Sequence, residues 1–319
     1  MKYSNVIDAI KDATNIAISG HVSPDGDSIG SSLALAHALK AIGKNPTVII
    51  DNPNDKYRII PGWQFVYDGT PQEASAALSP DLFIAVDCGD ATRLGDVQPL
   101  FEATPTTALI DHHINQGFAT YNYIEPTASS TCEMLYDIIS DLCTIDVDIA
   151  SCLYAGIVTD TGGFRQQNTT SKTFQVASKL VTLDIPFVDL FEQLLFSLTL
   201  KQFNGFITIV NDYVYVPELN VAYTTVTSEQ MSRLQVTKSD LDGVSNMLRR
   251  IKEVEIAIFA YENEKGKTKI SLRSNVTNIN EVAKAFGGGG HKLASGAELD
   301  LPPDQAVQKV IEKIRELKG

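Results

Sequence analysis

The fold is decided by residues 15–40, which read NIAISGHVSPDGDSIGSSLALAHALK. The run from 15 to 19 is almost entirely apolar and leads into Gly20 and His21, as expected for a buried strand. The residues from 27 to 40 place apolar side chains at helical spacing and therefore predict a helix. A strand that passes through a short polar loop into a helix is typical of an α/β domain.

The same pattern continues through the first half of the chain. Short, nearly continuous apolar runs at 46–51, 81–87 and 106–111 predict strands that are buried on both faces of a parallel sheet. Helices are expected near residues 131–141, 149–159 and 171–183. Alternating strands and helices predict a doubly wound α/β fold with a mainly parallel sheet.

The pattern changes near residues 184–186. The apolar helical segment that follows, FVDLFEQLLFSLTLKQF at 187–203, is expected to connect two domains. Beyond it, runs such as YVYVP, NVAYTTV, VEIAIFAYE and KTKISLRS alternate in polarity, as antiparallel strands do. We predict a first domain at 1–185, a helical linker at 186–205 and a smaller α+β domain at 206–319.

The composition is that of a globular protein, with 44% hydrophobic and 20% charged residues in a chain of 319. No apolar run approaches the roughly 20 residues that a membrane span needs, and the N-terminal residues carry charges where a signal peptide needs an apolar stretch. The four cysteines lack C-x-x-C spacing, which favours reduced thiols over disulfides or a zinc ribbon. We therefore expect a cytoplasmic protein that does not bind membranes.

The net charge of −13 is concentrated in the first half of the chain. Residues 1–199 carry −14 and residues 200–319 carry +1. An acidic half is often only a solvated surface, but it can also mean that several carboxylates converge to hold cations. Binding of duplex DNA is disfavoured, because neutralising its phosphates requires clustered Lys and Arg.

Residues that can bind metal ions follow three of the predicted strands and end one predicted helix. They are His21, Asp25, Asp27, Asp87, Asp111, His112, His113 and Asp160. Because ligands bind at the carboxyl ends of parallel strands, we expect these side chains to meet at one edge of the sheet. Each aspartate also has an ordinary alternative role: a strand-end Asp often caps a helix, and Asp27 could cap the helix that it begins.

The donor types favour a centre of two divalent cations. Carboxylates and imidazoles without thiolates suit Mn²⁺, Mg²⁺ or Fe²⁺ better than structural zinc. So many ligands exceed the needs of one ion with open positions, whereas a pair of ions about 3.5–4 Å apart would use them. Asp87, alone at its strand end, is the candidate bridge. A water held between the ions would be the nucleophile, which predicts hydrolysis at phosphorus.

The second half offers candidates for binding a phosphate. The segment GGGGHKLASG at 287–296 joins a predicted helix to a predicted strand, and glycines let backbone N–H groups approach an anion closely. It lacks the spacing of a P-loop, and a glycine run is often only a flexible turn. The candidate substrate-binding residues are Arg165, Arg273, Gly288, Gly289, Gly290, His291 and Lys292.

Taken together, these motifs resemble the DHH phosphoesterases, specifically the branch that carries a DHHA1 domain. The sequence H-x-x-x-D-x-D-x-x-G-S begins at His21, and VDCGD surrounds Asp87. The signature itself is Asp111, His112 and His113, and TDTGGF surrounds Asp160. GGGGH at 287–291 resembles the hallmark of DHHA1 domains. The resemblance covers nearly the whole chain.

The resemblance implies a manganese-dependent phosphoesterase with its active site in the cleft between the domains. One ion would be held by His21, Asp25 and Asp87, and the other by Asp27, Asp87, His112 and Asp160. Asp111 would orient a ligand histidine, and His113 would face the scissile phosphate or the leaving group. Arg273 and His291 would bind the phosphate of the substrate.

Within the family the chain resembles the NrnA type, which combines oligoribonuclease and 3′-phosphoadenosine-5′-phosphate phosphatase activities. The expected substrates are short single-stranded oligonucleotides, including linear dinucleotides, and small phosphonucleotides. A homodimer is expected from family likeness alone. Two alternatives remain open at this point: a pyrophosphatase or short-chain polyphosphatase of the same superfamily, and a nucleotide-binding regulator without catalytic activity.

Overall fold

A computed structural model describes residues 2–241 and 243–318. The chain divides into two compact units, which we call unit 1 (Met1–Ser197) and unit 2 (Leu198–Gly319). The domain limits expected from the sequence alone stay a prediction. None of the helices among the described residues is long and apolar enough to cross a membrane.

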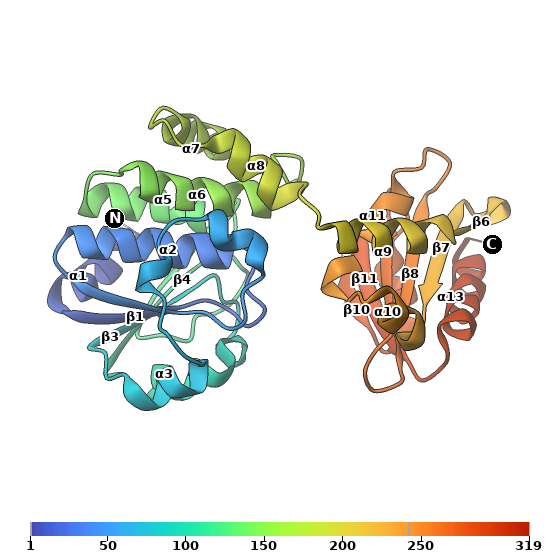
Figure 1. Cartoon of the computed structure of the whole chain (residues 1–319), viewed down its shortest axis with the longest axis horizontal. Helices are drawn as coiled ribbons and strands as arrows, with labels where there is room; N and C mark the ends of the chain where they lie inside the picture. Colours follow the sequence, from blue (N-terminus) through green and yellow to red (C-terminus); the bar gives the residue numbers. More distant parts are fainter. Residues whose placement is uncertain (1, 242, 319) are drawn as a thin grey trace. The chain divides into compact units, whose positions relative to one another are not determined.

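Unit 1 is built on a parallel sheet with the strand order β2-β1-β3-β4-β5 (Figure 1). The strands are β1 (Asn15–Ser19), β2 (Asn45–Ile49), β3 (Leu82–Val86), β4 (Thr106–Asp111) and β5 (Tyr121–Ile124). Every residue of the central strand β3 is buried, which explains why its sequence is uninterrupted apolar. The doubly wound α/β prediction is confirmed for this unit. The short edge strand β5 was not predicted, because its four residues mix polar and apolar side chains.

Helices cover both faces of this sheet (Figure 1). They are α1 (Ser4–Asp12), α2 (Gly26–Ala41), α3 (Pro71–Ala77), α4 (Gln98–Ala103), α5 (Thr131–Leu142), α6 (Val147–Asp160), α7 (Ser171–Val181) and α8 (Phe187–Leu195). The larger core lies on the face of α2, α5 and α6, and a smaller core lies beneath α3 and α4. Helix α2 is central, since 13 of its 16 residues are buried.

Two glycines allow α2 and α6 to pack closely. A Cβ atom on Gly30 of α2 would lie 2.6 Å from the carbonyl oxygen of Cys152 in α6. A Cβ atom on Gly156 of α6 would lie 2.2 Å from Sγ of Cys132 and 2.7 Å from Oδ1 of Asp27. Because a larger residue would collide at either position, these two glycines allow α2 to pack against α6 and bring the carboxylate of Asp27 close to Gly156 of α6.

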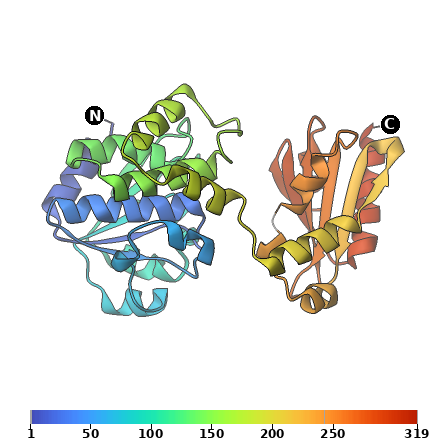
Figure 2. The ribbon, with the colours of Figure 1, turned by 45° about the horizontal axis from the view of Figure 1, so that its top comes forward.

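Unit 2 holds a mixed sheet with the strand order β10-β11-β9-β8-β7-β6. The strands are β6 (Val214–Val216), β7 (Val221–Val226), β8 (Ile256–Glu262), β9 (Thr268–Ser274), β10 (Gly289–His291) and β11 (Ala294–Leu299). Helix α13 packs against one face of this sheet and α9 against the other (Figure 2). The helices are α9 (Leu200–Asn211), α10 (Ser228–Leu234), α11 (Val244–Arg249), α12 (Ile279–Ala285) and α13 (Pro303–Lys318).

The structure differs in two details from the sequence expectations for this region. The segment at 187–203 is not one helix, because α8 ends before Phe196 and Thr199 caps the new helix α9 by accepting the backbone N–H of Gln202. The division between the units falls inside this break. The strands are not all antiparallel, since β7 and β8 pair in parallel. Helices α10 and α11 lie between these strands in the chain and form the crossover that a parallel pair requires.

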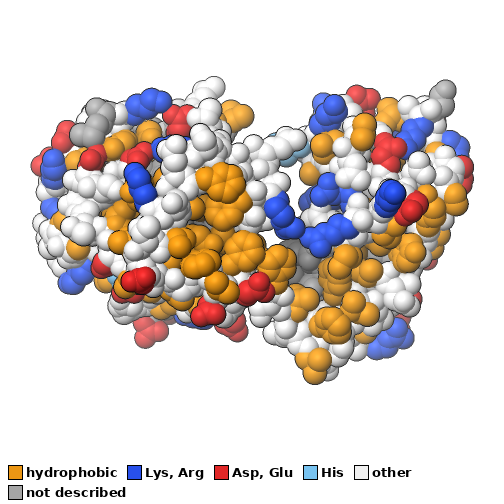
Figure 3. All heavy atoms as spheres, turned by 90° about the horizontal axis from the view of Figure 1, so that it is seen from above, with side chains coloured by type: hydrophobic (Ala, Val, Ile, Leu, Met, Phe, Trp, Pro, Cys, Tyr) orange, Lys and Arg blue, Asp and Glu red, His pale blue; other side chains and the backbone are white. Residues whose placement is uncertain are grey.

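Large apolar side chains remain exposed on the outer helices of unit 1. They include Phe174 of α7 and Phe187 and Val188 of α8. Figure 3 shows hydrophobic side chains gathered on one face of this unit.

Candidate metal centre

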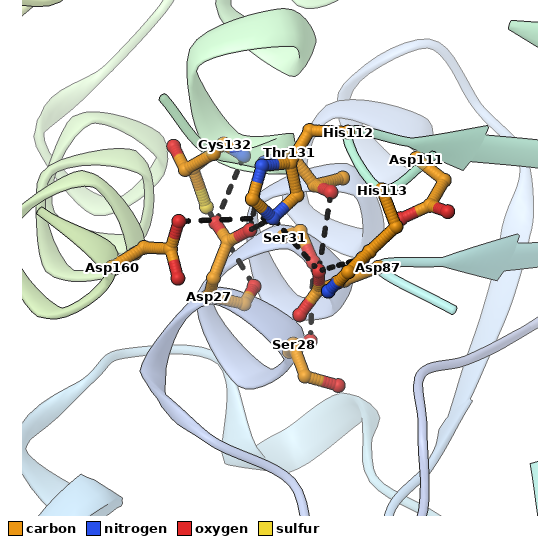
Figure 4. Close-up of polar contacts among 12 residues, drawn as sticks. Asp27, Ser28, Ser31, Asp87, Asp111, His112, His113, Thr131, Cys132 and Asp160 are labelled. Carbon is orange, nitrogen blue, oxygen red and sulfur yellow. Dashed lines mark hydrogen bonds and ion pairs between the residues drawn. The ribbon is translucent and has the colours of Figure 1, made fainter. Parts of the chain in front are cut away.

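The carboxyl ends of the parallel strands in unit 1 carry a cluster of acidic and imidazole side chains. His21 follows β1, Asp87 follows β3 directly, and Asp111 ends β4. Asp160 is the last residue of α6. Because these strands are parallel neighbours, the residues that follow them come together at one edge of the sheet, and Asp160 joins them from α6 (Figure 4).

Asp87 lies at the middle of the cluster, and its two carboxylate oxygens face different partners. On one side, its Oδ2 atom lies 3.6 Å from Nε2 of His21, which is itself 3.7 Å from Oδ2 of Asp25. On the other side, its Oδ1 atom lies 3.5 Å from Nε2 of His112. The donor atoms of His21, Asp25 and Asp87 all lie within 4.8 Å of one another.

The second group surrounds His112 (Figure 4). Nε2 of His112 lies 3.7 Å from Oδ2 of Asp160 and 4.0 Å from Oδ2 of Asp27. These separations are longer than hydrogen bonds. Two donor atoms that share an ion at about 2.1 Å each can be no more than about 4.2 Å apart, so the observed separations allow a shared ion. The donors, which are carboxylate oxygens and imidazole nitrogens, fit a divalent cation.

The electrostatics of the cluster favour added positive charge. Burial, reinforced by the charge of Asp87, raises the pKa of Asp27 well above its ordinary value. Burial also raises the pKa of Asp160 to about 6. Burial acts to raise the pKa of Asp87 too, but the neighbouring imidazoles of His112 and His21 outweigh it and hold that pKa well below its usual range. The buried carboxylates of Asp27 and Asp87 thus lie in a site that they share with further acidic side chains.

The two imidazoles respond in the opposite direction. Burial lowers the pKa of His21 and of His112, but neighbouring carboxylates outweigh burial and raise each pKa to about 10. For His21 these carboxylates are Asp25 and Asp87, and for His112 the largest contribution comes from Asp87. Without metal, protons on the imidazoles supply the positive charge that balances the acidic cluster.

The carboxylate of Asp27 is fixed by the start of α5. It accepts the backbone N–H of Thr131 at 2.7 Å and the backbone N–H of Cys132 at 3.0 Å. Amides at a helix N-terminus stabilise a buried negative charge. The suggestion that Asp27 caps the helix α2 is wrong, because Asp25 is its N-cap and accepts the backbone N–H groups of Asp27 and Ser28. Asp25 therefore caps α2 and also places its Oδ2 atom near His21.

Asp87 adopts a backbone conformation that is unusual for a residue other than glycine. Its φ angle is +52°, and its N–H donates to the carbonyl oxygen of Ile110 at 3.0 Å. Such a conformation costs on the order of 1–3 kcal/mol, and it persists only where the surroundings impose it. The turn directs a side chain that is 2% exposed into the middle of the cluster.

Asp111 makes a side-chain hydrogen bond to a histidine of the cluster. Its Oδ1 atom accepts from Nδ1 of His113 at 2.8 Å. Asn115 also donates to Asp111 through its side-chain amide. The hydrogen bond from Asp111 raises the pKa of His113. With Nδ1 engaged, Nε2 of His113 is the ring nitrogen left for another partner, and this side chain is 43% exposed.

Two residues of the cluster were not found from the sequence. The amide of Asn168 donates to Oδ2 of Asp160 at 3.2 Å and to the carbonyl oxygen of Ser129 at 2.8 Å. The hydroxyl of Thr131 lies 3.5 Å from Oδ1 of Asp87. Asn168 belongs to a polar loop without periodicity, and the serines and threonine at 129–131 resemble an ordinary helix cap. Neither segment carried a signal of this contact.

The candidate phosphate-binding residues divide between the units. In unit 2, a cavity of about 700 Å³ is lined by Arg273, His291 and the glycines at 287–290, among others. Lys292 is exposed and is not one of the residues that line this cavity. Arg165 lies in unit 1, where its Nε atom donates to the carbonyl oxygen of Gly162 at 2.8 Å.

The glycine run has a structural reason beyond anion binding. A Cβ atom on Gly288 would lie 2.1 Å from the carbonyl oxygen of Gly296, and one on Gly290 would lie 2.6 Å from that of Ala294. These two glycines therefore let β10 approach β11. Gly289 is different, because a Cβ atom there would meet nothing within 4 Å. Of these three positions, only Gly289 could take a side chain into open space.

The fold and the cluster together define a class of metal-dependent hydrolases built on a parallel α/β sheet. The family model described as "DHH family, N-terminal domain" matches residues 15–157, and the model described as "DHHA1 domain" matches residues 218–318. The use of divalent metal ions is general in this family.

Comparison with known proteins narrows the class. A protein of Thermus thermophilus named bifunctional oligoribonuclease and PAP phosphatase NrnA is 30% identical over 306 residues, covering 94% of this chain and 89% of that protein. A protein of Mycoplasma genitalium with the same name is 32% identical over 306 residues, covering 92% and 91%. The crystal structure of an exopolyphosphatase-related protein from Bacteroides fragilis is similar over the whole chain, with 28% identity, a TM-score of 0.89 and 98% of that chain covered. The chain therefore belongs to the DHH–DHHA1 family of hydrolases that includes these NrnA relatives.

Proposed function

We propose that this protein is a two-metal phosphoesterase that hydrolyses short oligoribonucleotides and 3′-phosphoadenosine-5′-phosphate. The observation that carries this proposal is the carboxylate of Asp87, whose two oxygens face two separate sets of donors at 3.5–3.6 Å. One carboxylate between two donor sets is the arrangement that a pair of bridged cations requires. The two NrnA relatives carry both activities in their names.

The proposed centre assigns a role to each residue of the cluster. His21, Asp25 and Asp87 would hold one cation, and the other would be held by Asp27, Asp87, His112 and Asp160. When bound, the two cations would neutralise the substrate phosphate and lower the pKa of an attacking water. The amides of Thr131 and Cys132 hold Asp27 in place, and Asn168 holds Asp160.

His113 would act on the leaving group. Its Nδ1 atom is fixed by Asp111 at 2.8 Å, which orients the ring and leaves Nε2 for the substrate. From Nε2 it would donate a proton to the oxygen that departs from phosphorus. In this role Asp111 positions a catalytic histidine. The proposed ligand His112 instead lies near the carboxylates of Asp27, Asp87 and Asp160.

We propose Mn²⁺ as the native metal, because mixed carboxylate and imidazole donors suit it.

Arg273 and His291 would contribute to binding the substrate phosphate, with Lys292 and Arg165 as further candidates. Duplex nucleic acid is not expected as a substrate, since unit 1 is strongly acidic. The homodimer stays a prediction, which light scattering of the purified protein tests.

The decisive experiment follows mononucleotide release from a short oligoribonucleotide by chromatography, with Mn²⁺ and after its removal. Asp87→Asn should lose about 10²-fold or more in turnover and bind fewer Mn²⁺ ions per chain, measured by elemental analysis. The matched control is Asp90→Asn in the same loop, because Asp90 is exposed and its carboxylate accepts the N–H and hydroxyl of Thr92. This control should keep its metal and its activity.

Two results would contradict the proposal. Turnover of pyrophosphate without release of nucleotides from the oligomer would indicate a pyrophosphatase or polyphosphatase. Nucleotide binding without hydrolysis of any of these substrates, unchanged in Asp87→Asn, would indicate a regulator.

A further inference from the structure

The cavity in unit 2 is larger than a single phosphate site requires. Its volume of about 700 Å³ lies in the range of pockets that hold small organic ligands. The strands β8, β9, β10 and β11 contribute to its lining, and they present alternate residues on one face. The strand pairing arranges these residues in three rows across the sheet.

The first row carries the expected phosphate-binding residues. His291 of β10 pairs with Ala294 of β11, which pairs with Arg273 of β9. The middle row consists mainly of small residues, since Gly289 pairs with Gly296 and Gly296 pairs with Ser271. This row leaves open space above the sheet, since a Cβ atom on Gly289 would meet no other atom within 4 Å.

The third row has a different chemistry. Glu298 of β11 pairs with Lys269 of β9, which pairs with Tyr261 of β8. Nζ of Lys269 lies 2.8 Å from Oε2 of Glu298, and the lysine side chain is 47% exposed. The Tyr261 ring is half-buried and stacks on Phe259, with ring centroids 5.6 Å apart. The third row therefore combines a cation, an aromatic ring and a carboxylate at the cavity wall.

The separation of the first and third rows suits a nucleotide chain. Arg273 and Lys269 are four residues apart on one strand, which corresponds to about 13 Å. A substrate with more than one nucleotide can place one phosphate at Arg273 and another at Lys269, because both side chains line the same cavity.

We propose that the third row is a second subsite, in which Lys269 binds a further phosphate and Tyr261 contacts a further base of the oligonucleotide. This inference rests on the proposed function and adds a determinant of substrate length to it. Glu298 has a defined part, because its carboxylate competes with phosphate for Lys269. The subsite thus favours oligonucleotides over 3′-phosphoadenosine-5′-phosphate only when phosphate displaces Glu298 from the lysine.

The test compares two substrates in three variants of the full chain. For Lys269→Ala, the ratio of KM for a pentaribonucleotide to KM for 3′-phosphoadenosine-5′-phosphate should rise about three- to tenfold, because an exposed ionic contact is lost. For Glu298→Gln the same ratio should fall, because the competing charge is gone. Misfolding cannot produce these opposite signs together. The matched control is Lys267→Ala, which removes a lysine 3.7 Å from Glu298 that does not line the cavity.

Binding gives a readout independent of catalysis. A fluorescent phosphorothioate pentaribonucleotide, which resists hydrolysis, is titrated with Mn²⁺-loaded protein at several salt concentrations. Loss of one phosphate contact should make the slope of log Kd against log salt shallower by about 0.7 in Lys269→Ala and leave it unchanged in Lys267→Ala.

The outcomes separate this inference from the proposed function. Equal salt slopes and equal KM ratios in the two lysine variants would overturn the second subsite, even if the wild type hydrolyses both substrates. Wild-type protein that binds the pentamer with the predicted slopes but hydrolyses no oligonucleotide would overturn the proposed function and leave the subsite standing.

Discussion

At the scale of single residues, the positions that follow the parallel strands of unit 1 predicted part of the acidic and imidazole cluster. The parallel sheet explains why His21, Asp87 and His112 meet, because each follows a neighbouring strand at the same edge. The supporting contacts were beyond prediction. Asn168 reaches Asp160 from a loop, and Thr131 reaches Asp87 from the start of α5, so both depend on packing that no local pattern encodes.

Asp160 gives a prediction in which the effect on stability depends on metal. Burial raises the pKa of this carboxyl to about 6 from 3.8, so in the metal-free protein its ionised form is less favourable in the folded state than in the unfolded state. Wild-type stability is therefore lost as pH rises from about 4 through about 6. Above pH 6, metal-free Asp160→Asn should be more stable by about 1–3 kcal/mol, and below pH 4 the difference should vanish.

With saturating Mn²⁺, Asp160→Asn should instead be less stable than wild type, because the variant lacks a proposed metal ligand. Denaturant unfolding at several pH values, with EDTA and with Mn²⁺, measures both effects. A variant that is less stable than wild type in EDTA at pH 8 would show that Asp160 stabilises the metal-free fold.

Gly289 gives a second prediction at this scale. Its φ angle is not in the left-handed region, and a Cβ atom there has no neighbour within 4 Å, so Gly289→Ala should change the free energy of unfolding by less than about 0.5 kcal/mol. The added methyl group would stand on the cavity floor and should raise KM severalfold. Gly288→Ala is the contrasting variant, since its Cβ atom would collide with the backbone of β11. If Gly289→Ala leaves KM unchanged, the floor of the cavity does not contact substrate.

At the scale of elements, the sequence predicts regular, strongly periodic segments better than their pairing. The four longer parallel strands of unit 1 were found from apolar runs, whereas β5 is too short and mixed to be recognised. In unit 2, alternating polarity identified strands but did not give their direction. The parallel pairing of β7 and β8 follows from the crossover through α10 and α11, which is a property of the chain path.

The close packing of α2 and α6 leads to a prediction for the metal centre. In Gly156→Ala the new methyl group would overlap Sγ of Cys132 and press on Oδ1 of Asp27, so the helices must separate. We expect a loss of about 1–3 kcal/mol in the free energy of unfolding and weaker Mn²⁺ binding. Adding Cys132→Ala removes the nearest atom and should restore part of the stability. Calorimetric titration and denaturant unfolding of both single variants and the double variant measure the coupling; additive losses would show that the contact does not set the helix spacing.

At the scale of the whole molecule, charge and chemistry are divided between the two units. The acidic residues concentrate in the first half of the chain, where the candidate metal centre lies, and the large cavity with its lysine and arginine side chains lies in unit 2. The change in sequence pattern near residues 184–186 indicated two domains, but the break between α8 and α9 depends on the cap at Thr199. Metal binding and anion binding should therefore be separable by experiment.

The single tryptophan makes this separation measurable. Trp63 lies in unit 1, in contact with Arg58, so selectively excited tryptophan fluorescence follows the unfolding of that unit alone. A ligand that binds only the folded state stabilises it by about 2.7 kcal/mol at 100 times its Kd. Mn²⁺ should therefore raise the melting temperature detected by Trp63, and EDTA should return it to the metal-free value. Asp87→Asn should abolish this shift, whereas Lys269→Ala should preserve it. A tryptophan-detected transition that Mn²⁺ does not move in the wild type would place the bound metal outside unit 1.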